Sequence, residues 1–209
     1  MLVGKILVFF FIDLLIMDKS NGYDRIAPIF IKGRGKAVNG IGASSVRGWT
    51  QTLNPGSVVL DLGCGTGIPV SKILIEAGMK VYGIDASPSM VAAFQANFPN
   101  RIIACEAVED STFFNLKFDA IIAWGLIFLI SEEVQIKLIG KAAAALKTNG
   151  KFLFTSPPAK IFWNDAMTDQ VSRSLGAEKY KELIAETGLI LVAEFEDEGE
   201  NHYYASVKA

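Results

Sequence analysis

A glycine-rich turn between an apolar run and a helical pattern is the feature that most restricts how this chain can fold. Residues 58–85 read "VVLDLGCGTGIPVSKILIEAGMKVYGID", which places Gly63, Gly65 and Gly67 within five positions. Glycine has no side chain and tolerates positive φ, so such a turn brings the backbone close to a bound molecule. A strand that leads through a turn of this kind into a helix is typical of α/β sheets that bind nucleotides.

The rest of the chain alternates short β-rich runs with longer helical patterns. From residue 57 onward this alternation predicts a parallel sheet covered by helices. We expect strands at 57–62, 80–85, 101–105, 118–124 and 151–156, and helices at 69–78, 87–98, 132–147 and 177–188. Ser87 and Pro88 are expected to start the second helix, and Gly150 to follow the end of the third. The runs at 189–197 and 201–208 predict a closing antiparallel hairpin.

The predicted fold class is therefore α/β. The elements add up to a three-layer sandwich around a mostly parallel, seven-stranded sheet that ends in an antiparallel hairpin strand. The stretch 157–174 shows no clear period and contains aromatic residues. Loops of that length are often lids or binding loops, so we expect an irregular loop near the site.

Length and composition indicate one domain with a small extension. The chain has 209 residues, of which 51% are hydrophobic and 20% are charged, so a full core is expected. The net charge of −2 provides no general attraction to nucleic acid or to anionic membranes. Cys64 and Cys105 form neither a disulfide framework nor a metal cluster, and Cys105 is expected to be a small buried side chain. These features predict a reduced, cytoplasmic compartment, no bound metal and no nucleic-acid partner.

The first residues depart from that description. Residues 1–16 form an apolar run interrupted by Asp13, which is too short for a bilayer because a span needs about 20 apolar residues. No signal-peptide cleavage site follows it in "MDKSNGYD". Three interpretations stay open: extra residues ahead of a true start at Met17, an element that packs on the domain or on a partner, or an export or membrane signal. We expect an apolar extension at 1–16, a helical cap at 17–56 and a ligand-binding domain at 57–209, without stable membrane insertion.

The residues around the glycine turn discriminate between ligands. A nicotinamide fingerprint needs G-x-G-x-x-G, but position 68 is Ile. A phosphate loop needs Lys followed by Ser or Thr after its last glycine, where Ile68 and Pro69 stand. Asp61, at the end of the first strand, would repel a pyrophosphate, whereas Asp85, at the end of the second, suits the hydroxyls of a ribose. The residues favour a nucleoside with a cationic end, as in S-adenosylmethionine (SAM).

"VLDLGCGTG" together with "VYGIDAS" resembles the class I, Rossmann-like, SAM-dependent methyltransferases, and specifically their small-molecule branch. The resemblance runs from about residue 23 to the end, and it implies a Rossmann-like sheet, SAM as cofactor and methyl transfer to a small-molecule acceptor. It places the glycine turn under the methionine part of SAM, "CEAVED" at the adenine, "AWGLIF" at the floor and "NGYDRIAPIF" over the cofactor. Glu106 stands where the family usually has Asp. The cofactor-binding residues that the resemblance implies are Tyr23, Asp61, Gly63, Cys64, Gly65, Gly67, Asp85, Ala86, Ser87, Met90, Glu106, Ala107, Val108, Ala123 and Trp124.

No motif identifies a catalytic base. The methyl group of SAM is already activated, so a base is needed only for an acceptor that arrives protonated. His202, the only histidine, is the first candidate by its ordinary pKa, followed by Asp165 and Tyr203. Because side chains alternate along a strand, His202 and Tyr204 are expected on one side of it and Tyr203 on the other.

Two other functions remain open at this point. One is an NAD(P)-dependent oxidoreductase, which the glycine spacing disfavours. The other is a non-catalytic SAM-binding or partner-binding module, for which the apolar N-terminus would be a docking element. The sequence "SPPA" at 156–159 is similar to a motif of amino-methyltransferases that act on nucleic-acid bases. It follows the fifth strand rather than the fourth and lacks the stacking aromatic residue, so we interpret it as a turn.

Overall fold

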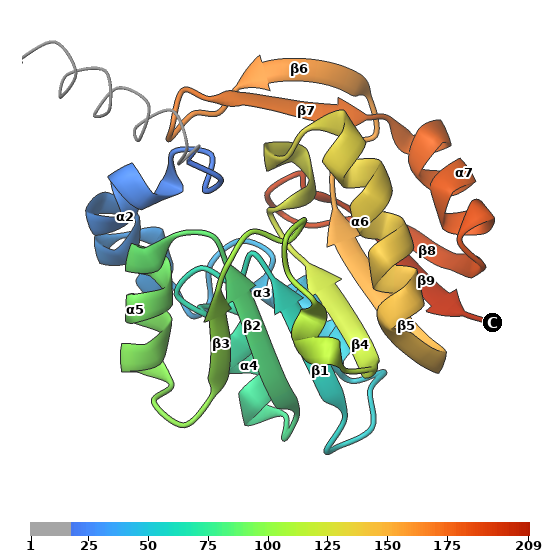
Figure 1. Ribbon diagram of the computed structural model, residues 1–209, viewed down its shortest axis with the longest axis horizontal. Coiled ribbons are helices and arrows are strands. Elements are labelled where there is room, and N and C mark those ends of the chain that lie inside the picture. Colours follow the sequence, from blue (N-terminus) through green and yellow to red (C-terminus); the bar gives the residue numbers. More distant parts are fainter. Residues whose placement is uncertain (1–17) are drawn as a thin grey trace, which may run out of the picture.

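The computed structural model describes residues 18–209, and its centre is a seven-stranded sheet in the order β3-β2-β1-β4-β5-β9-β8 (Figure 1). The extension predicted for residues 1–16 lies outside the described residues. Strands β1 to β5 run parallel, and β9 pairs antiparallel with both β5 and β8. The predicted fold class is confirmed. The strands are β1 (Val58–Leu62), β2 (Lys80–Asp85), β3 (Ile102–Cys105), β4 (Phe118–Ala123), β5 (Leu146–Thr155), β8 (Leu189–Glu196) and β9 (His202–Lys208).

Helices cover both faces of the sheet. One hydrophobic layer joins the sheet to α6 and α7, and the other joins it to α3 and α4. Helix α5 packs against β2 and β3 at one edge. The helices are α2 (Tyr23–Lys32), α3 (Ala43–Thr50), α4 (Val70–Glu76), α5 (Pro88–Asn97), α6 (Glu132–Ala145) and α7 (Ala177–Glu186), with short 3₁₀ turns η1 (Arg34–Lys36), η2 (Phe113–Asn115) and η3 (Ile127–Leu129). None of the helices in residues 18–209 is long and apolar enough to cross a membrane.

Local signals place most helix ends correctly. Ser87 is the N-cap of α5, where its Oγ accepts a hydrogen bond from the Met90 N–H at 3.1 Å, and Pro88 opens the helix. The prediction that Gly150 follows the end of α6 is wrong, because α6 ends at Ala145 and β5 begins at Leu146. A distant lysine replaces the glycine cap: Lys208 Nζ donates to the Ala143 and Leu146 carbonyls at 2.8 and 3.0 Å.

Two further sequence expectations are corrected. Cys105 is exposed rather than buried, because it lies on β3, the edge strand of the sheet. Residues 157–174 are not irregular but contain an antiparallel hairpin of β6 (Lys160–Asn164) and β7 (Val171–Leu175). The sequence of β7 shows no alternation of apolar and polar residues, because two serines occupy its inward-facing positions. Ser172 and Ser174 are both fully buried.

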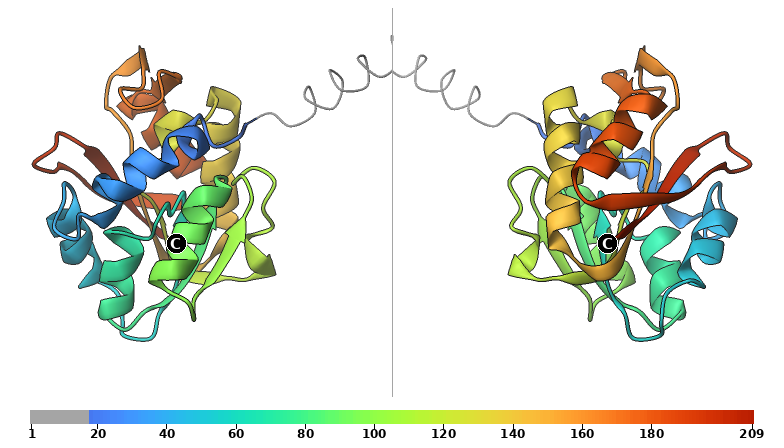
Figure 2. Two further views of the ribbon diagram at one scale, coloured as in Figure 1. Left: turned by 90° about the vertical axis from the view of Figure 1, so that its left-hand side faces the viewer. Right: turned by 90° about the vertical axis from the view of Figure 1, so that its right-hand side faces the viewer.

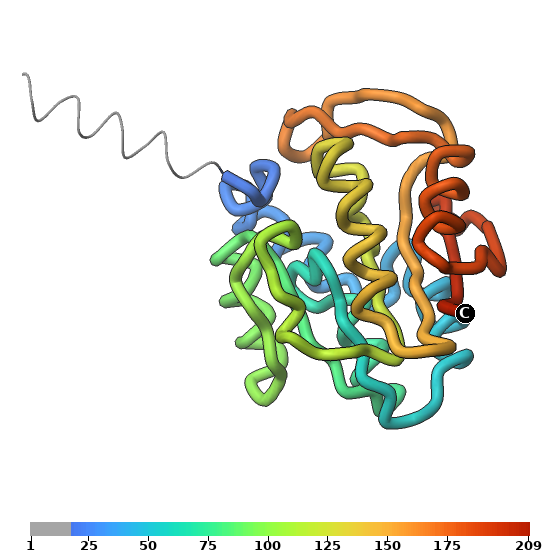
Figure 3. Tube along the Cα trace, turned by 45° about the vertical axis from the view of Figure 1, so that its right-hand side comes forward, coloured from blue at the N-terminus to red at the C-terminus, as the bar shows by residue number. Residues whose placement is uncertain are grey.

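The hairpin and α2 meet at one end of the molecule, above the carboxyl ends of the parallel strands (Figures 2 and 3). Arg25 on α2 donates through Nη2 to the Thr168 carbonyl in the β6–β7 turn at 3.0 Å. Asp24, its neighbour, accepts hydrogen bonds from Ser87 Oγ at 2.6 Å and from the Ser89 N–H at 3.0 Å. Helix α2 is thus tied both to the hairpin and to the start of α5.

The glycines of the β1–α4 turn serve different purposes. Gly65 and Gly67 both have positive φ, of 54° and 78°. A Cβ on Gly67 would lie 2.5 Å from Phe98 and 2.8 Å from Phe94, so this glycine lets the turn pack against α5. A Cβ on Gly65 would meet nothing within 4 Å, so this glycine faces open space.

We expect Gly67→Ala to destabilise the protein more than Gly65→Ala. Both variants carry the cost of a left-handed alanine, about 1 kcal/mol, and Gly67→Ala adds an overpacking cost of roughly 1–3 kcal/mol against the two phenylalanine rings. Urea unfolding of both variants measures the difference. Equal losses of stability would contradict the packing role of Gly67.

Candidate cofactor and acceptor site

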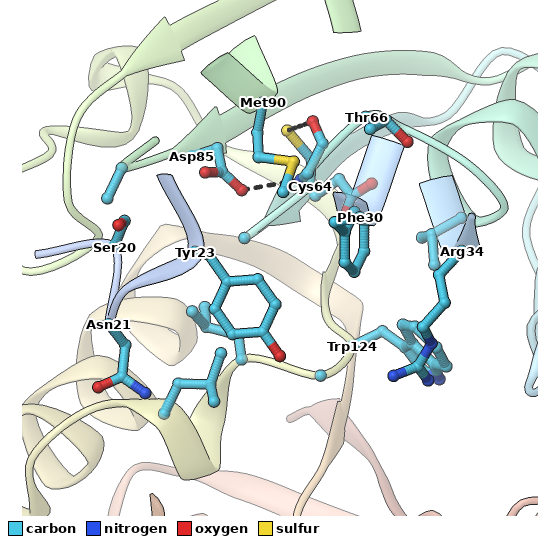
Figure 4. Close-up of a pocket in the computed structure, with 18 of the residues that line it drawn as sticks. Ser20, Asn21, Tyr23, Phe30, Arg34, Cys64, Thr66, Asp85, Met90 and Trp124 are labelled. Carbon is cyan, nitrogen blue, oxygen red and sulfur yellow. Dashed lines mark hydrogen bonds between the residues drawn. The ribbon is translucent and has the colours of Figure 1, made fainter. Parts of the chain in front are cut away.

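A cavity of about 370 Å³ lies at the carboxyl ends of β1, β2 and β4, below α2 (Figure 4). This is the edge at which open α/β sheets bind their ligands. Among the residues predicted to bind the cofactor, those that line the cavity are Tyr23, Asp61, Gly63, Cys64, Gly65, Asp85, Ala86, Met90, Ala107, Val108 and Trp124.

Four predicted residues stand behind the lining. Gly67 packs against α5, and Ser87 caps that helix. Ala123 is fully buried at the end of β4. Glu106 is half-buried and supports the site through its backbone, because its N–H donates to the Asp85 carbonyl at 3.0 Å.

Asp85 holds the glycine turn in place. Its Oδ2 accepts a hydrogen bond from the Gly65 N–H at 2.8 Å, and its Oδ1 accepts one from the Ser87 N–H at 2.9 Å. Burial raises the pKa of Asp85 despite these two hydrogen bonds. One carboxylate thereby joins the turn after β1 to the start of α5, and it lacks a cation to offset its burial among residues 18–209.

Asp61 is the second carboxyl at this edge, and it is 1% exposed. Burial raises its pKa to about 7, the hydrogen bond from Ser71 Oγ at 2.6 Å opposes that shift, and the charge of Asp85 adds to it. Burial and the same two carboxylates also raise the pKa of the Cys64 thiol. The thiol is therefore protonated at neutral pH, which does not suit a nucleophile.

Tyr23 forms part of the roof. Its ring packs edge-on against Phe30, with 5.8 Å between the ring centroids. Its hydroxyl donates to Asp165 Oδ2 across a long distance of 3.4 Å, and burial together with the Asp165 charge raises the pKa of Tyr23 to about 12. The phenol is therefore a hydrogen-bond donor at neutral pH.

Trp124 is fixed at another corner of the cavity by a relay of two hydrogen bonds. Its Nε1–H donates to Tyr203 Oη at 2.7 Å, and Tyr203 Oη donates to Asp197 Oδ2, also at 2.7 Å. Tyr203 is fully buried and stacks on Phe195 with 4.7 Å between the centroids. Burial and the bond to Asp197 raise the pKa of Tyr203, so this residue positions Trp124 as a neutral phenol.

The three candidate bases are not gathered in the cavity. His202 lies on the other side of β9 between Glu194 and Glu196, with ring nitrogen to carboxylate distances of 3.2 and 3.3 Å. Asp165 closes the β6–β7 turn, where its Oδ1 accepts the Met167 and Thr168 N–H groups at 2.9 Å. The predicted alternation is confirmed, since His202 contacts Tyr204 edge-on while Tyr203 faces the opposite layer.

Residues 59–150 match a family model described as "Methyltransferase domain". The matched stretch runs from β1 into β5 and contains the glycine turn and the carboxyl edge of the parallel strands. The cypemycin N-terminal methyltransferase of a Streptomyces species is 31% identical over 137 residues, which cover 63% of this chain and 56% of that protein. The tRNA U34 carboxymethyltransferase of Campylobacter curvus is 35% identical over 102 residues, or 46% of this chain and 33% of that protein. The chain thus spans little more than half the length of the first of these relatives, and a third of the second.

The similarity to solved methyltransferase structures extends beyond residues 59–150 to nearly the whole chain. The CcbJ methyltransferase from Streptomyces caelestis superposes with a TM-score of 0.73 at 17% identity, covering 92% of this chain and 100% of that one. The magnesium protoporphyrin IX methyltransferase from Synechocystis PCC 6803, solved with bound SAM, gives 0.68 at 16% identity, with 93% and 99% covered. The shared architecture includes the elements before β1 and after β5.

The residues around the glycine turn do not predict a second group of side chains that line the cavity. These side chains come from the end of α2, η1, the loop before α3, the η3 region and the β8–β9 turn, which the fold brings together. They include Phe30, Arg34, Ile41, Phe128, Leu129 and Asn201. Thr66, inside the glycine motif, is not among the predicted site residues either. Its Oγ1 donates to the Gly35 carbonyl at 3.0 Å and joins the turn to η1. Among residues 18–209, no group of three or more His, Cys, Asp or Glu side chains is placed to hold a metal ion.

The relay from Trp124 through Tyr203 to Asp197 leads to a stability prediction. Tyr203→Phe leaves Trp124 Nε1 and Asp197 Oδ2 without their shared partner, so we expect a loss of roughly 1–3 kcal/mol in the free energy of unfolding. Tyr204→Phe is the matched control, because Tyr204 is equally buried and its Oη has no hydrogen-bond partner in the part of the chain described. In chemical unfolding, the free energy of unfolding of Tyr204→Phe should equal or exceed that of wild type. Similar losses in both variants would contradict the relay.

The buried Asp61 leads to a pH prediction. Its folded pKa of about 7 lies above its unfolded value, so between about pH 4 and pH 7 the folded state binds more protons and stability falls as pH rises. We expect Asp61→Asn to gain stability relative to wild type across that range, by a few kcal/mol at the order of magnitude, and to keep a constant difference above it. Urea unfolding at several pH values without ligand measures this.

Asp119→Asn supplies the control for Asp61→Asn. Burial opposes ionisation of Asp119, but the Lys147 ammonium and the Val58 N–H outweigh it and lower the pKa of this carboxyl. Stability contributed by Asp119 is therefore present above its unfolded pKa and is lost as pH falls through the folded value. The two variants should diverge from wild type in opposite directions as pH rises. A pH-independent difference for Asp61→Asn would refute its raised pKa.

Proposed function

We propose that this protein is a SAM-dependent methyltransferase that acts on a small molecule. The observation that carries the proposal is the pairing of an open glycine turn with two carboxyl groups, the buried Asp61 and the half-buried Asp85, on one wall of the cavity. The methyltransferase family model and the solved relative with bound SAM support the same cofactor.

The residues present fit SAM. Burial without a cation raises the pKa of both Asp61 and Asp85, so a ligand that carries positive charge would favour their ionised forms. Asp85 would accept the ribose hydroxyls, and Asp61 would lie near the amino group of the methionine part. Gly65, with open space before it, would pack against that part, and Ala107 and Val108 would border the adenine.

The enclosure of the cavity favours a small acceptor over nucleic acid. The roof is closed by two hydrogen bonds between α2 and the β6–β7 turn, Arg25 to Thr168 and Tyr23 to Asp165. A volume of about 370 Å³ lies within the usual range for small-molecule sites. The relative named for tRNA makes an RNA acceptor the second candidate, and the net charge of −2 weighs against it.

Methyl transfer in this site depends on binding and positioning. Bound SAM would supply a methyl group activated by its sulfonium. The chain's part is to hold the acceptor in line with that group under the α2 roof and to exclude water. Asp165 accepts a hydrogen bond within the β6–β7 turn, Tyr203 donates one to Asp197, and His202 does not line the cavity. We therefore propose that none of these three takes the acceptor's proton, which passes to water when the methylated product leaves the cavity.

Calorimetric titration with SAM, S-adenosylhomocysteine and NADH tests the cofactor. We expect both sulfur nucleosides to bind and NADH not to bind. Asp85→Ala should weaken their binding at least about tenfold, because it removes the ribose acceptor and releases the Gly65 N–H; tenfold corresponds to about 1.4 kcal/mol. Asp119→Asn, a carboxylate near the opposite end of β4, should bind as wild type does. Binding of NADH instead would favour an oxidoreductase, and no binding to folded protein would favour a non-catalytic module.

A further inference from the structure

The β6–β7 hairpin exposes several large apolar side chains within two short strands. Ile161, Phe162 and Val171 are 39%, 59% and 45% exposed. The hairpin forms a sheet of its own, which arches over one end of the molecule (Figures 1 and 3). Single exposed apolar residues are common on protein surfaces, but a cluster of them marks a surface that contacts another molecule.

The strand register gives the hairpin two different faces. Trp163 is paired with the buried Ser172 and packs against Phe128 of the cavity lining, with 5.6 Å between the ring centroids. That face is turned toward the cavity. Phe162 alternates with Trp163, and its cross-strand partner is Arg173. Because successive side chains of a strand point to opposite sides, Phe162 and Arg173 lie together on the outer face.

The outer face carries positive charge that no carboxylate pairs with. The residues of β6 and β7 include two cations, Lys160 and Arg173, and no acid. Neither cation forms an ion pair among residues 18–209. The Arg173 Nη2 reaches only the Val171 carbonyl, at 3.5 Å, and its Nε has no hydrogen-bond partner in the same part of the chain. An exposed aromatic ring is therefore flanked by two cations that are available to anions.

The start of the described chain lies beside this hairpin. A Cβ on Gly22 would lie 3.1 Å from Thr168 Cβ in the β6–β7 turn, and Arg25 donates to the Thr168 carbonyl. Figures 1 and 2 show α2 and the hairpin at the same end of the molecule. The residues that precede Asp18 in sequence are therefore attached next to the outer face of the hairpin.

The sequence of the attached segment calls for an apolar environment. Residues 1–16 are apolar apart from Gly4, Lys5 and Asp13, whereas the outer face of the hairpin exposes only two large apolar side chains, Phe162 and Val171. Two side chains are too few to shield such a run from water. A lipid leaflet would shield it and would also place an aromatic ring and cations at the headgroups, where both are favourable. The run is shorter than the about 20 residues that a bilayer span needs.

We propose that this end of the protein binds the surface of an anionic lipid bilayer. Residues 1–16 enter one leaflet, and Lys160, Phe162 and Arg173 lie against the headgroups. The net charge of −2 provides no general attraction, so the contact depends on these two local cations, whose field extends about 10 Å at moderate salt. The contact is independent of methyl transfer. It places the hairpin that roofs the cavity at the lipid surface.

Sedimentation of the full chain with lipid vesicles tests the proposal. We expect binding to vesicles of phosphatidylcholine with phosphatidylglycerol, weaker binding to phosphatidylcholine alone, and an affinity that falls as salt rises. Lys160→Gln should lower the affinity for the mixed vesicles about fivefold, since one cation at an anionic surface contributes about that factor. Phe162→Ser should lower it about tenfold, and Phe10→Asp, which places a charge in the apolar run, by more.

Matched controls come from elsewhere on the surface. Val192 is 60% exposed, much as Phe162 is, but it lies on β8 at the edge of the central sheet. Lys80 is an exposed cation at the start of β2, opposite to the carboxyl ends of the strands. Val192→Ser and Lys80→Gln should bind the mixed vesicles as wild type does.

A fluorescent reporter locates the contact. In the full chain, Phe162→Trp should be quenched by brominated lipids more strongly than wild type, whose own tryptophans give the background. Val192→Trp should show no such excess. Light scattering without lipid records whether the full chain is a monomer.

Each of the other outcomes would overturn the proposal. Failure of the folded full chain to bind the mixed vesicles is one. Another is binding that Phe162→Ser and Phe10→Asp leave unchanged, or that gives Phe162→Trp no excess quenching. A lipid-free dimer that Phe162→Ser separates would make the outer face an interface between copies. A blue-shifted emission of Phe162→Trp in a lipid-free monomer, unchanged by lipid, would mean that residues 1–16 cover the hairpin themselves.

Discussion

The site depends on one carboxylate that performs two structural tasks. Asp85 Oδ2 holds the Gly65 N–H and Oδ1 holds the Ser87 N–H, so the turn after β1 and the cap of α5 share a single side chain. Gly67 makes this possible, because only a glycine lets the turn approach Phe94 and Phe98 closely. With its N–H held by Asp85 and the turn packed at Gly67, Gly65 faces open space. The backbone that faces the cavity is thereby fixed before any ligand arrives, and a fixed site avoids ordering costs on binding.

The parts of the site that local sequence determines were predictable. Strand-end acids and glycines in a fixed spacing mark the carboxyl edge of a sheet, and a Ser-Pro pair marks a helix start, so β1, β2 and α5 follow from the residues themselves. Side chains that reach the cavity from distant segments carry no such mark. Arg34 belongs to a short "KGRGK" stretch that has the composition of an exposed loop, and the hydrogen bond from Thr66 to the Gly35 carbonyl is what joins that stretch to the glycine turn.

Polar residues with structural roles account for the other differences between the sequence-based predictions and the structure. Ser172 and Ser174 occupy inner positions of β7 and hide the hairpin from any search for alternating apolar residues. Tyr203 and Asp165 look like acid–base groups in the sequence, yet one is a link between Trp124 and Asp197, and the other closes a turn. His202 is placed between two carboxylates of β8 by the same alternation that turns Tyr203 toward Trp124. Residue type alone does not separate such roles; the strand register does.

One turn of α2 ties the roof of the cavity to three neighbouring segments. Tyr23, Asp24 and Arg25 are consecutive, and residues of a helix project about 100° apart, so they reach three different neighbours: Asp165, the start of α5 and the Thr168 carbonyl. Each link is one or two hydrogen bonds at a partly exposed position, and a hydrogen bond of that kind contributes only about 1 kcal/mol. The wall at Asp61 and Asp85 is held more firmly, because Asp61 is buried and Asp85 accepts hydrogen bonds from two backbone N–H groups. Displacing the first turn of α2 would therefore cost less free energy than disturbing the carboxyl groups and glycines on the wall beneath it.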